Sequence, residues 1–347
     1  MRTRGDDGIV APMSVPATFE LELPAIPEHL EVFFEDPAVP GGFANPWGTN
    51  IQPEFSRLLR WQTQRNPWRA RKKAGADAPR LTRDPRGALD AADAQGRLTW
   101  LGHASVLATV DGVTVLVDPV FGRAGPVPRK APTPLSPDEL PHVDVVAVTH
   151  GHYDHLDRAS LAALGKRFGE DTLFVTPRGL SGTLPKACRR RMELTWWQGV
   201  TVGGVDVVLV PAQHWHRRGL LDVNRALWGG FVVRGGRTVY HSGDTGHFGG
   251  FEAIGLAFPS LDTAVLPIGA WEPRWFMGDQ HMDPDGSVAA FQALGAQRFV
   301  AMHWNTFDLT DEPLDEGPRE LRMAAERAAI TFDSRFVVPA HGETVAL

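Results

Sequence analysis

Cysteine and tyrosine are scarce in this 347-residue sequence, which has one cysteine, Cys188, and two tyrosines. A single cysteine excludes a disulfide framework within the chain and a zinc site built on several thiolates. The sequence also lacks an uninterrupted apolar run of about 18 residues, which a membrane-spanning helix needs. No apolar segment follows Arg2 and Arg4, so we expect no secretory signal and a cytoplasmic protein.

An excess of basic residues is also absent, because the formal net charge is −6. Nucleic-acid binding depends on a basic face that contacts phosphates, so we expect no nucleic-acid partner. Hydrophobic residues make up 43% of the chain and charged residues 22%, which is ordinary for a folded globular protein. These values exclude disorder as the main state.

Histidine, by contrast, is abundant, with thirteen residues, twelve of which follow residue 100. Histidine is the commonest metal ligand and the commonest acid or base near neutral pH. The chemistry is therefore expected in the C-terminal two-thirds of the chain.

The chain divides into three regions by composition. Residues 1–45 are rich in proline and acidic residues and are expected to form an extended or partly disordered arm. Residues 46–95 form a basic, Trp-containing helical segment and linker, with helical spacing from Pro53 to Thr63. That helix either packs on the main domain or lies at a membrane surface. Residues 96–347 read as one layered domain.

Strand and helix patterns alternate through the third region. The Asp111-Gly112 turn between two apolar runs predicts a hairpin, and the apolar run 143–148 predicts a buried strand. Residues 157–168 and the segment after Asp285 have helical spacing. The further strands and the last helix are predicted at Leu173–Thr176, Val205–Pro211, Gly230–Val233, Thr238–His241, Thr263–Pro267, Phe299–Met302, Phe336–Pro339 and Arg319–Ala329. The pattern favours an α/β fold with two sheets face to face and helices outside.

A dense cluster of metal-binding residue types follows the buried strand 143–148. His150 and His152 are two positions apart, so in extended chain they point the same way and can share one metal. Asp154 and His155 come after the chain turns and can face a second metal. The spacing therefore predicts a binuclear centre held by the end of a rigid strand.

Three further candidate ligands follow other predicted strands. Each zinc ion takes about four ligands, so six residues of loop cannot complete two coordination spheres. His214, Asp244 and His303 each stand just after a strand and are expected to join the cluster. The carboxylate of Asp244 can bridge two cations, which an imidazole does not do.

The pattern His150-x-His152-x-Asp154-His155 with His214, Asp244 and His303 resembles the metallo-β-lactamase superfamily. Further motifs resemble one of its families, the N-acyl-phosphatidylethanolamine-hydrolysing phospholipases D, over residues 97–345. These motifs are Trp100–Ala104, Asp118–Phe121, Trp196-Trp197, Gln213–Trp215, Leu227–Gly229, Gly243–Gly246, Leu266–Met277, Gln280–Pro284, His303–Phe307 and His341–Glu343. The resemblance implies an αββα sandwich of two mixed sheets over 96–347.

The resemblance also implies the ligand sets and the reaction. One zinc would be held by His150, His152 and His214, and the other by Asp154, His155 and His303, with Asp244 between them. Two Zn²⁺ per chain are expected, although these ligands suit other divalent metals as well. A bridging hydroxide would attack phosphorus and convert N-acyl-phosphatidylethanolamine to N-acylethanolamine and phosphatidic acid.

Other residues match the family outside the ligand set. Tyr153 and His281 are expected to contact the substrate, with His281 either protonating the leaving group or binding the phosphate. His281, Asp154 and Asp244 are the predicted catalytic residues. His103 is expected either to support the site or to be a buried structural histidine.

Three remaining residues near the motifs are interpreted separately. His341 is expected to support the site from outside the ligands. His216 matches no family position; it either contacts the substrate or is merely solvated, and solvation is the favoured interpretation. Arg274 either neutralises a phosphate or forms a structural ion pair with Glu272.

A lactone hydrolase, of the ascorbate-phosphate lactonase or acyl-homoserine lactonase type, is the alternative function, because it shares the metal motif. A non-catalytic metal-binding or lipid-sensing protein is a third, which the intact ligand set disfavours. The expected partners are a phospholipid or another small-molecule substrate and, peripherally, a membrane surface. A homodimer is compatible with the sequence.

Overall fold

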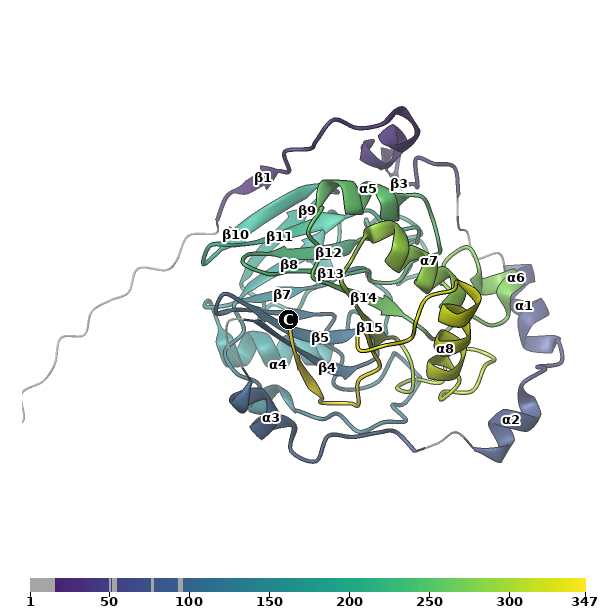
Figure 1. Ribbon diagram of the computed structural model, residues 1–347. Coiled ribbons are helices and arrows are strands. Elements are labelled where there is room, and N and C mark those ends of the chain that lie inside the picture. The colour runs from purple at the N-terminus through teal and green to yellow at the C-terminus, as the bar shows by residue number, and fades with distance from the viewer. Residues whose placement is uncertain (1–15, 50, 52–54, 76–77, 93–95) are drawn as a thin grey trace, which may run out of the picture.

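The computed structural model describes residues 16–49, 51, 55–75, 78–92 and 96–347. Two large sheets pack face to face, with helices on their outer sides (Figure 1). This arrangement confirms the predicted αββα sandwich. Among the described residues, no helix has the length and apolarity needed to cross a bilayer.

The first sheet has eight strands, and the part from β13 to β16 is parallel. In spatial order its strands are β1 (Thr18–Glu20), β10 (Gln198–Val202), β11 (Val205–Val210), β12 (Gly230–Arg234), β13 (Thr238–His241), β14 (Thr263–Pro267), β15 (Arg298–Met302) and β16 (Phe336–Val337).

The second sheet has seven strands, and the part from β6 to β9 is parallel. In spatial order its strands are β17 (Thr344–Ala346), β4 (Gly96–Gly102), β5 (Ser105–Val110), β6 (Val113–Val117), β7 (Val145–Ala147), β8 (Leu173–Pro177) and β9 (Arg190–Leu194). A separate small hairpin pairs β2 (Ala38–Val39) with β3 (Gly42–Phe43).

Helices surround the sandwich and connect its parallel strands. The α-helices are α1 (Phe55–Thr63), α2 (Arg69–Ala74), α3 (Pro85–Ala91), α4 (Arg158–Phe168), α5 (Gly250–Ala257), α6 (Arg274–Met277), α7 (Pro284–Leu294) and α8 (Gly317–Arg327). Short 3₁₀ helices are η1 (Glu28–Phe34), η2 (Pro137–Glu139) and η3 (Ser181–Thr183).

Burial on both faces explains why β7 is a continuous apolar run. Val145 and Ala147 face the other sheet and join the large core between the two sheets. Val146 faces outward and packs in a second core that contains Leu161 and Leu164 of α4. Because side chains alternate along a strand, a strand covered on both sides needs apolar residues throughout.

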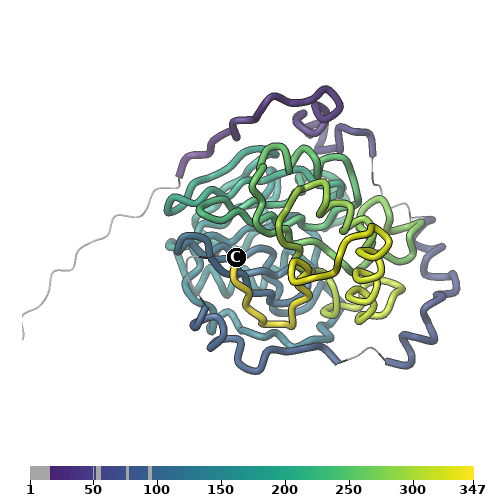
Figure 2. Tube along the Cα trace, viewed as in Figure 1, coloured from purple at the N-terminus to yellow at the C-terminus, as the bar shows by residue number. Residues whose placement is uncertain are grey.

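The described residues between 16 and 92 run around the outside of the sandwich, as the purple and blue tube in Figure 2 shows. β1 extends the eight-stranded sheet by pairing antiparallel with β10. Farther along, η1 contacts α5, α1 contacts α6, and α3 contacts β17. Residues 1–15 of the expected N-terminal arm lie outside the described residues, and the rest of this segment is held by both sheets.

Most predicted elements coincide with observed ones, including the β5–β6 hairpin, α4 and α7. The predictions omitted β1, β2, β3, β9, β10, β17, α3, α5 and α6. β9 contains Arg190, Arg191 and Glu193, and β10 contains Gln198 and Thr201. Pairing with neighbouring strands makes these polar segments strands. α5 is apolar on most sides because it contacts both η1 and α7.

At Gly165 in α4, the close packing of the helix and the helix propensity of the residue predict opposite effects of a substitution by alanine. Replacing a helical glycine with alanine ordinarily stabilises a helix by about 1 kcal/mol. A Cβ at Gly165, however, would lie 2.6 Å from the carbonyl carbon and oxygen of Ala187. We therefore expect Gly165→Ala to lower the free energy of unfolding by roughly 1–3 kcal/mol in chemical denaturation.

Gly182 is the matched control, because a Cβ there meets no heavy atom within 4 Å. Gly182→Ala should change the free energy of unfolding by no more than about 0.5 kcal/mol. A stabilising effect of Gly165→Ala would contradict the close packing of α4 on the 187–188 backbone.

Candidate metal centre

The predicted ligands come from the ends of four strands that meet at one edge of the sandwich. The loop 149–155 follows β7, His214 follows β11, Asp244 follows β13, and His303 follows β15. Side chains at the carboxyl ends of such strands can converge on one crevice, which is where α/β sheets bind ligands. The structure brings all seven predicted ligand residues together at this edge.

The first group is formed by three imidazoles. His150 Nε2 lies 3.0 Å from His152 Nδ1, and His214 Nε2 lies 3.2 Å from the same atom. His150 and His214 are 1% exposed. Three imidazole nitrogens pointing at one another within this distance form an arrangement that can hold a cation with nitrogen ligands.

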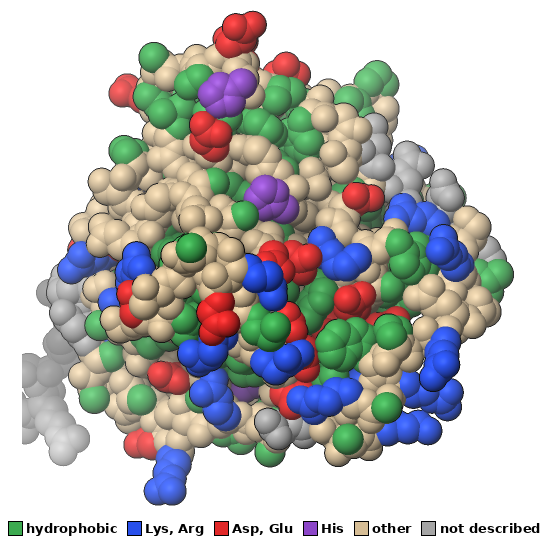
Figure 3. Space-filling model, turned by 45° about the vertical axis from the view of Figure 1, so that its right-hand side comes forward, with side chains coloured by type: hydrophobic (Ala, Val, Ile, Leu, Met, Phe, Trp, Pro, Cys, Tyr) green, Lys and Arg blue, Asp and Glu red, His purple; other side chains and the backbone are tan. Residues whose placement is uncertain are grey.

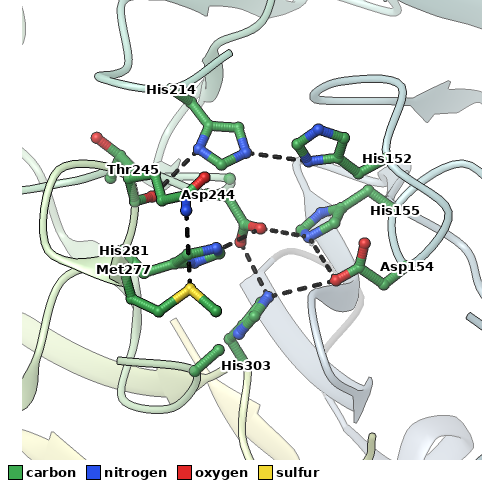
Figure 4. A network of polar contacts seen from close by, with 12 residues as sticks. His152, Asp154, His155, His214, Asp244, Thr245, Met277, His281 and His303 are labelled. Carbon is green, nitrogen blue, oxygen red and sulfur yellow. Dashed lines mark hydrogen bonds and ion pairs between the residues drawn. The ribbon is translucent and has the colours of Figure 1, made fainter. Parts of the chain in front are cut away.

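The second group surrounds the carboxylate of Asp244 (Figure 4). Asp244 Oδ2 lies 3.0 Å from His155 Nε2, and Asp244 Oδ1 lies 3.0 Å from His303 Nε2. Asp154 Oδ2 approaches the same two imidazoles, at 3.8 Å from His155 Nε2 and 3.9 Å from His303 Nε2. Asp244 also reaches the first group, 3.9 Å from His150 Nε2.

The donor atoms at the centre fit metal ions. His155 Nε2, His303 Nε2 and Asp244 Oδ1 are buried and have no hydrogen-bond partner among the described residues. Buried polar atoms are otherwise almost always satisfied, so this concentration of unsatisfied nitrogen and oxygen atoms fits a site that holds cations. The donors are nitrogen and oxygen, which suit zinc and several other divalent metals.

The charges at the centre stabilise one another. Burial alone would lower the pKa of His155, but Asp244, Asp118 and Asp154 raise it well above its ordinary value. Burial would raise the pKa of Asp244, but His155 and His303 hold it well below its ordinary range. A metal bound at His155 would therefore replace a proton, and the ion would take over the balance of charge.

The three imidazoles of the first group behave differently. Burial lowers the pKa of His152 to about 4 and lowers those of His150 and His214 well below the ordinary value. These rings are therefore neutral at pH 7, which is the state that binds a metal. His214 Nδ1 lies 3.1 Å from the carbonyl oxygen of Gln280, so a proton on Nδ1 leaves Nε2 free to face the cation.

Asp118, at the end of β6, orients the second group from outside. Its Oδ2 lies 2.7 Å from His155 Nδ1 and accepts a hydrogen bond from Thr149 Oγ1 at 2.6 Å. Its Oδ1 accepts from the backbone N–H of Thr149 at 2.7 Å. No role was predicted for Asp118 from the sequence. Its position just after a strand, which it shares with Asp244, is the signal that could have indicated a place in the site.

His103 contacts the site and does not merely pack in the core. Its Nε2 lies 3.0 Å from Asp154 Oδ2, and its ring centroid is 3.8 Å from that of His303. Burial lowers the pKa of His103 to about 3, so a neutral ring orients the carboxylate. His341 lies farther out, with Nε2 3.0 Å from Thr306 Oγ1, and Thr306 Oγ1 accepts a hydrogen bond from the backbone N–H of His103.

The N-terminal segment braces the loop that carries His214. Asn45 Nδ2 donates to the backbone carbonyl of His214 at 3.2 Å. Trp47 Nε1 donates to Gln213 Oε1 at 3.1 Å, and its ring stacks on Trp196. The conformation of the loop that carries His214 thus depends on residues that lie before residue 96, outside the hydrolase domain predicted from the sequence.

A pocket of about 320 Å³ opens on the two groups. Tyr153 and His281 both line it, as the sequence predicts for substrate-contacting residues. Burial lowers the pKa of His281 to about 4, and its Nδ1 lies 3.8 Å from Asp244 Oδ2. Tyr153 is 47% exposed and donates its hydroxyl to the carbonyl of Arg218.

Trp61 of α1 forms part of the pocket wall. Its ring stacks on Phe276 with centroids 5.2 Å apart, and Nε1 donates to Asp311 Oδ1 at 3.0 Å. Of the two roles expected for this helix, packing on the main domain is observed.

Two other expectations near the site have clear outcomes. His216 was interpreted as solvent-exposed, which is wrong: it is 4% exposed, because it packs against Gly151 of the metal loop. Arg274 forms a structural ion pair, but its partner is Asp283 at 3.1 Å, and Glu272, the predicted partner, accepts only the backbone N–H of Arg274. The guanidinium also donates to the carbonyl of His281.

Glu312 fixes residues 270–272 beside the pocket. No local sequence pattern predicts this role. Its carboxylate accepts backbone hydrogen bonds from Ala270 at 2.6 Å and from Glu272 at 3.1 Å. Burial raises the pKa of Glu312, and these bonds to the charged form oppose that change. Ala270, held at φ 63°, lines the pocket.

Comparisons with known proteins agree with this geometry. A family model described as "Beta-lactamase superfamily domain" matches residues 113–304. N-acyl-phosphatidylethanolamine-hydrolyzing phospholipase D 1 of Caenorhabditis elegans is 35% identical over 71% of this chain and 74% of its own length. The mitochondrial N-acyl-phosphatidylethanolamine-hydrolyzing phospholipase D of Saccharomyces cerevisiae is 32% identical over 71% of this chain and 55% of its own.

Solved structures share the fold. The metallo hydrolase Igni18 of Ignicoccus hospitalis has a TM-score of 0.56 at 24% identity, covering 73% of this chain and 98% of its own. The metallo-beta-lactamase fold protein YhfI of Bacillus subtilis has a TM-score of 0.51 at 15% identity, covering 72% and 98%.

The fold and the His/Asp cluster define a metal-dependent hydrolase. The chain belongs to the metallo-β-lactamase superfamily and, within it, to the family of N-acyl-phosphatidylethanolamine-hydrolysing phospholipases D.

The role of Asp118 can be tested by its effect on metal affinity. Asp118→Asn keeps the shape of the side chain but removes the charge that fixes the protonated Nδ1 of His155. Loss of such an outer hydrogen bond typically lowers metal affinity about 10–100-fold, and we expect a decrease in that range. The measurement is competition for zinc with a chelator of known affinity.

Asp333→Asn is the control, because Asp333 is an exposed carboxylate between α8 and β16. It should leave zinc affinity unchanged. Equal affinities of Asp118→Asn and the unmodified protein would show that Asp118 does not support the metal ligands.

Proposed function

We propose that the protein is a binuclear zinc phosphodiesterase of the phospholipase D type, which hydrolyses N-acyl-phosphatidylethanolamine to N-acylethanolamine and phosphatidic acid. The observation that carries the proposal is a pocket with an apolar wall that is also lined by three of the seven convergent donor residues, His152, Asp154 and Asp244. Its lining includes Trp61, Phe276, Met277 and Leu309, next to the carboxylates of the centre. The relatives from Caenorhabditis elegans and Saccharomyces cerevisiae support the same substrate class.

The pocket combines the two properties that a phospholipid diester requires. Hydrocarbon chains gain free energy by leaving water for a surface of aromatic and aliphatic side chains. The phosphodiester would lie at the inner end, where the donor residues meet. A sugar lactone has no hydrocarbon chain to place against Trp61 and Phe276, so this wall favours the lipid over a sugar lactone.

The protein side chains divide the chemical work. Two zinc ions, when bound, supply an activated water nucleophile and positive charge opposite the phosphate oxygens. Asp154 and Asp244 stay ionised, since neighbouring imidazoles hold their pKa values below the ordinary range. His281, with a pKa of about 4, is neutral at pH 7. A neutral ring favours hydrogen bonding to the substrate phosphate over proton donation to the leaving group.

A peripheral membrane contact belongs to the same proposal, because this substrate resides in a bilayer. Figure 3 shows Lys and Arg side chains gathered on the right of the molecule, over α1 and α2. Part of this charge is used within the protein: Arg57 donates to the carbonyl of Trp275, and Arg60 stacks over its ring. Exposed basic residues of this segment, such as Arg69 and Lys73, would face anionic headgroups in a cytoplasmic setting.

Hydrolysis of the lipid itself is the direct test. The zinc-loaded protein is expected to convert N-acyl-phosphatidylethanolamine in mixed micelles to equal amounts of N-acylethanolamine and phosphatidic acid. Chelator-treated protein should lose this turnover and regain it with added zinc. Both products are measured by mass spectrometry.

A panel of acyl-homoserine lactones and sugar lactones forms the second arm of the experiment. Turnover of a lactone without turnover of the phospholipid would contradict the proposal and favour a lactone hydrolase. Two bound zinc ions without turnover of any of these substrates would favour a non-catalytic protein.

A further inference from the structure

The connection between β11 and β12 exposes two adjacent leucines. Leu220 is 85% exposed and Leu221 is 84% exposed. Among the described residues, the next most exposed large apolar side chain is Leu59, at 49%. Single exposed apolar residues are common, but two adjacent leucines almost wholly in water suggest a surface that another apolar phase covers.

Hydrogen bonds hold the turn so that the leucines remain displayed. The carboxylate of Asp222 accepts from the backbone N–H groups of Gly219 at 2.7 Å and Arg218 at 3.2 Å. At the base of the turn, Asn224 donates its backbone N–H to the carbonyl of His216 at 2.8 Å. Asn224 Oδ1 accepts the backbone N–H of His216 at 3.0 Å, which closes the turn from the other side.

Arg218 joins this turn to the loop that carries the metal ligands. Its guanidinium donates to the carbonyls of Gly151 and Leu156, each at 2.9 Å. The same guanidinium lies 4.3 Å from the ring centroid of Tyr153, which lines the pocket. The turn that carries the leucine pair is therefore tied to a residue that lines the pocket.

The surroundings of the leucines indicate a lipid surface. Arg217 and Arg225 flank the turn, Arg225 is exposed, and Arg217 Nε donates to the carbonyl of Gly219 at 3.1 Å. Apolar side chains bordered by arginines suit the interfacial layer of a bilayer with anionic headgroups. A single turn offers little area for a stable protein interface, which buries about 1,200–2,000 Å² in total.

We propose that Leu220 and Leu221 insert into the interfacial layer of a membrane containing anionic phospholipids and hold the pocket mouth against it. This inference rests on the proposed function, because a lipid substrate is the reason for the protein to bind a membrane. Binding itself is measured without hydrolysis. Trp61 of α1 lines the same pocket as Tyr153, the residue that Arg218 of the leucine turn contacts, so the basic segment and the turn both adjoin the pocket wall. A lipid could then enter the pocket without crossing water.

The test is binding of the full chain to vesicles of phosphatidylcholine, with and without phosphatidylserine, measured by flotation. Leu220→Ser combined with Leu221→Ser should weaken binding to the mixed vesicles about tenfold for each leucine that no longer inserts. Leu220→Trp with Leu221→Trp should preserve or strengthen binding. The metal content and the unfolding midpoint of all variants should equal those of the unmodified protein.

Met323→Ser is the matched control, because Met323 is an exposed apolar residue (38%) on α8. It should leave vesicle binding unchanged. Equal binding by the double serine variant and the unmodified protein would overturn the inference. The inference would also be overturned if the unmodified protein sediments as a dimer and the double serine variant as a monomer, with vesicle binding unchanged. That result would identify a second copy of the chain as the partner of the leucines.

The two proposals can fail separately. Vesicle binding that depends on the leucines, in a protein that does not hydrolyse N-acyl-phosphatidylethanolamine, would retain the membrane contact and remove the proposed reaction. Hydrolysis of that lipid in micelles, with no vesicle binding through the leucines, would retain the proposed reaction and remove the membrane contact.

Discussion

The buried carboxylate of Asp244 is stable only because imidazoles and a cation can balance its charge. An isolated buried charge is very costly, and an ion pair offsets that cost only with good geometry and further hydrogen bonds. Asp244 lies within 3.0 Å of both His155 and His303, and it also faces the first imidazole group. The two sheets, the strained strand ends and the outer hydrogen bonds all serve to bring these groups to one place.

That requirement explains the unusual backbone at the site. Asp118, His103 and His303 have φ values of 45°, 54° and 62°, in a region that non-glycine residues seldom adopt. Each of them directs a side chain toward the centre or its supports. Residues are held in such conformations where the surrounding structure fixes them, and functional sites are where they concentrate. Trp100 stacks on Trp304, the neighbour of His303, and donates Nε1–H to the carbonyl of His103 at 2.8 Å.

The layered fold and the convergence of the ligand residues could be predicted from the sequence. The β5–β6 hairpin and β7 are defined by local patterns, and the spacing of His150, His152 and Asp154 follows from a turn at a strand end. The roles of the seven residues as zinc ligands stay predictions.

Supports that depend on distant contacts could not be predicted. Glu312 holds a backbone segment about forty positions away, and Asn45 reaches a loop 169 positions away. No local pattern encodes such pairs. β9 and β10 were missed for the same reason, since sheet pairing rather than their own polar sequences makes them strands. The burial of His216 likewise follows from tertiary packing against Gly151.

Metal content compared between the unmodified protein and Asp244→Ala tests the central claim most directly. The claim is that one carboxylate joins two groups of donors into a binuclear centre. Inductively coupled plasma mass spectrometry on zinc-saturated, gel-filtered protein should find two zinc ions per unmodified chain. In Asp244→Ala it should find at most one, with a folded protein by circular dichroism. Two tightly bound ions in that variant would contradict the bridging role of Asp244.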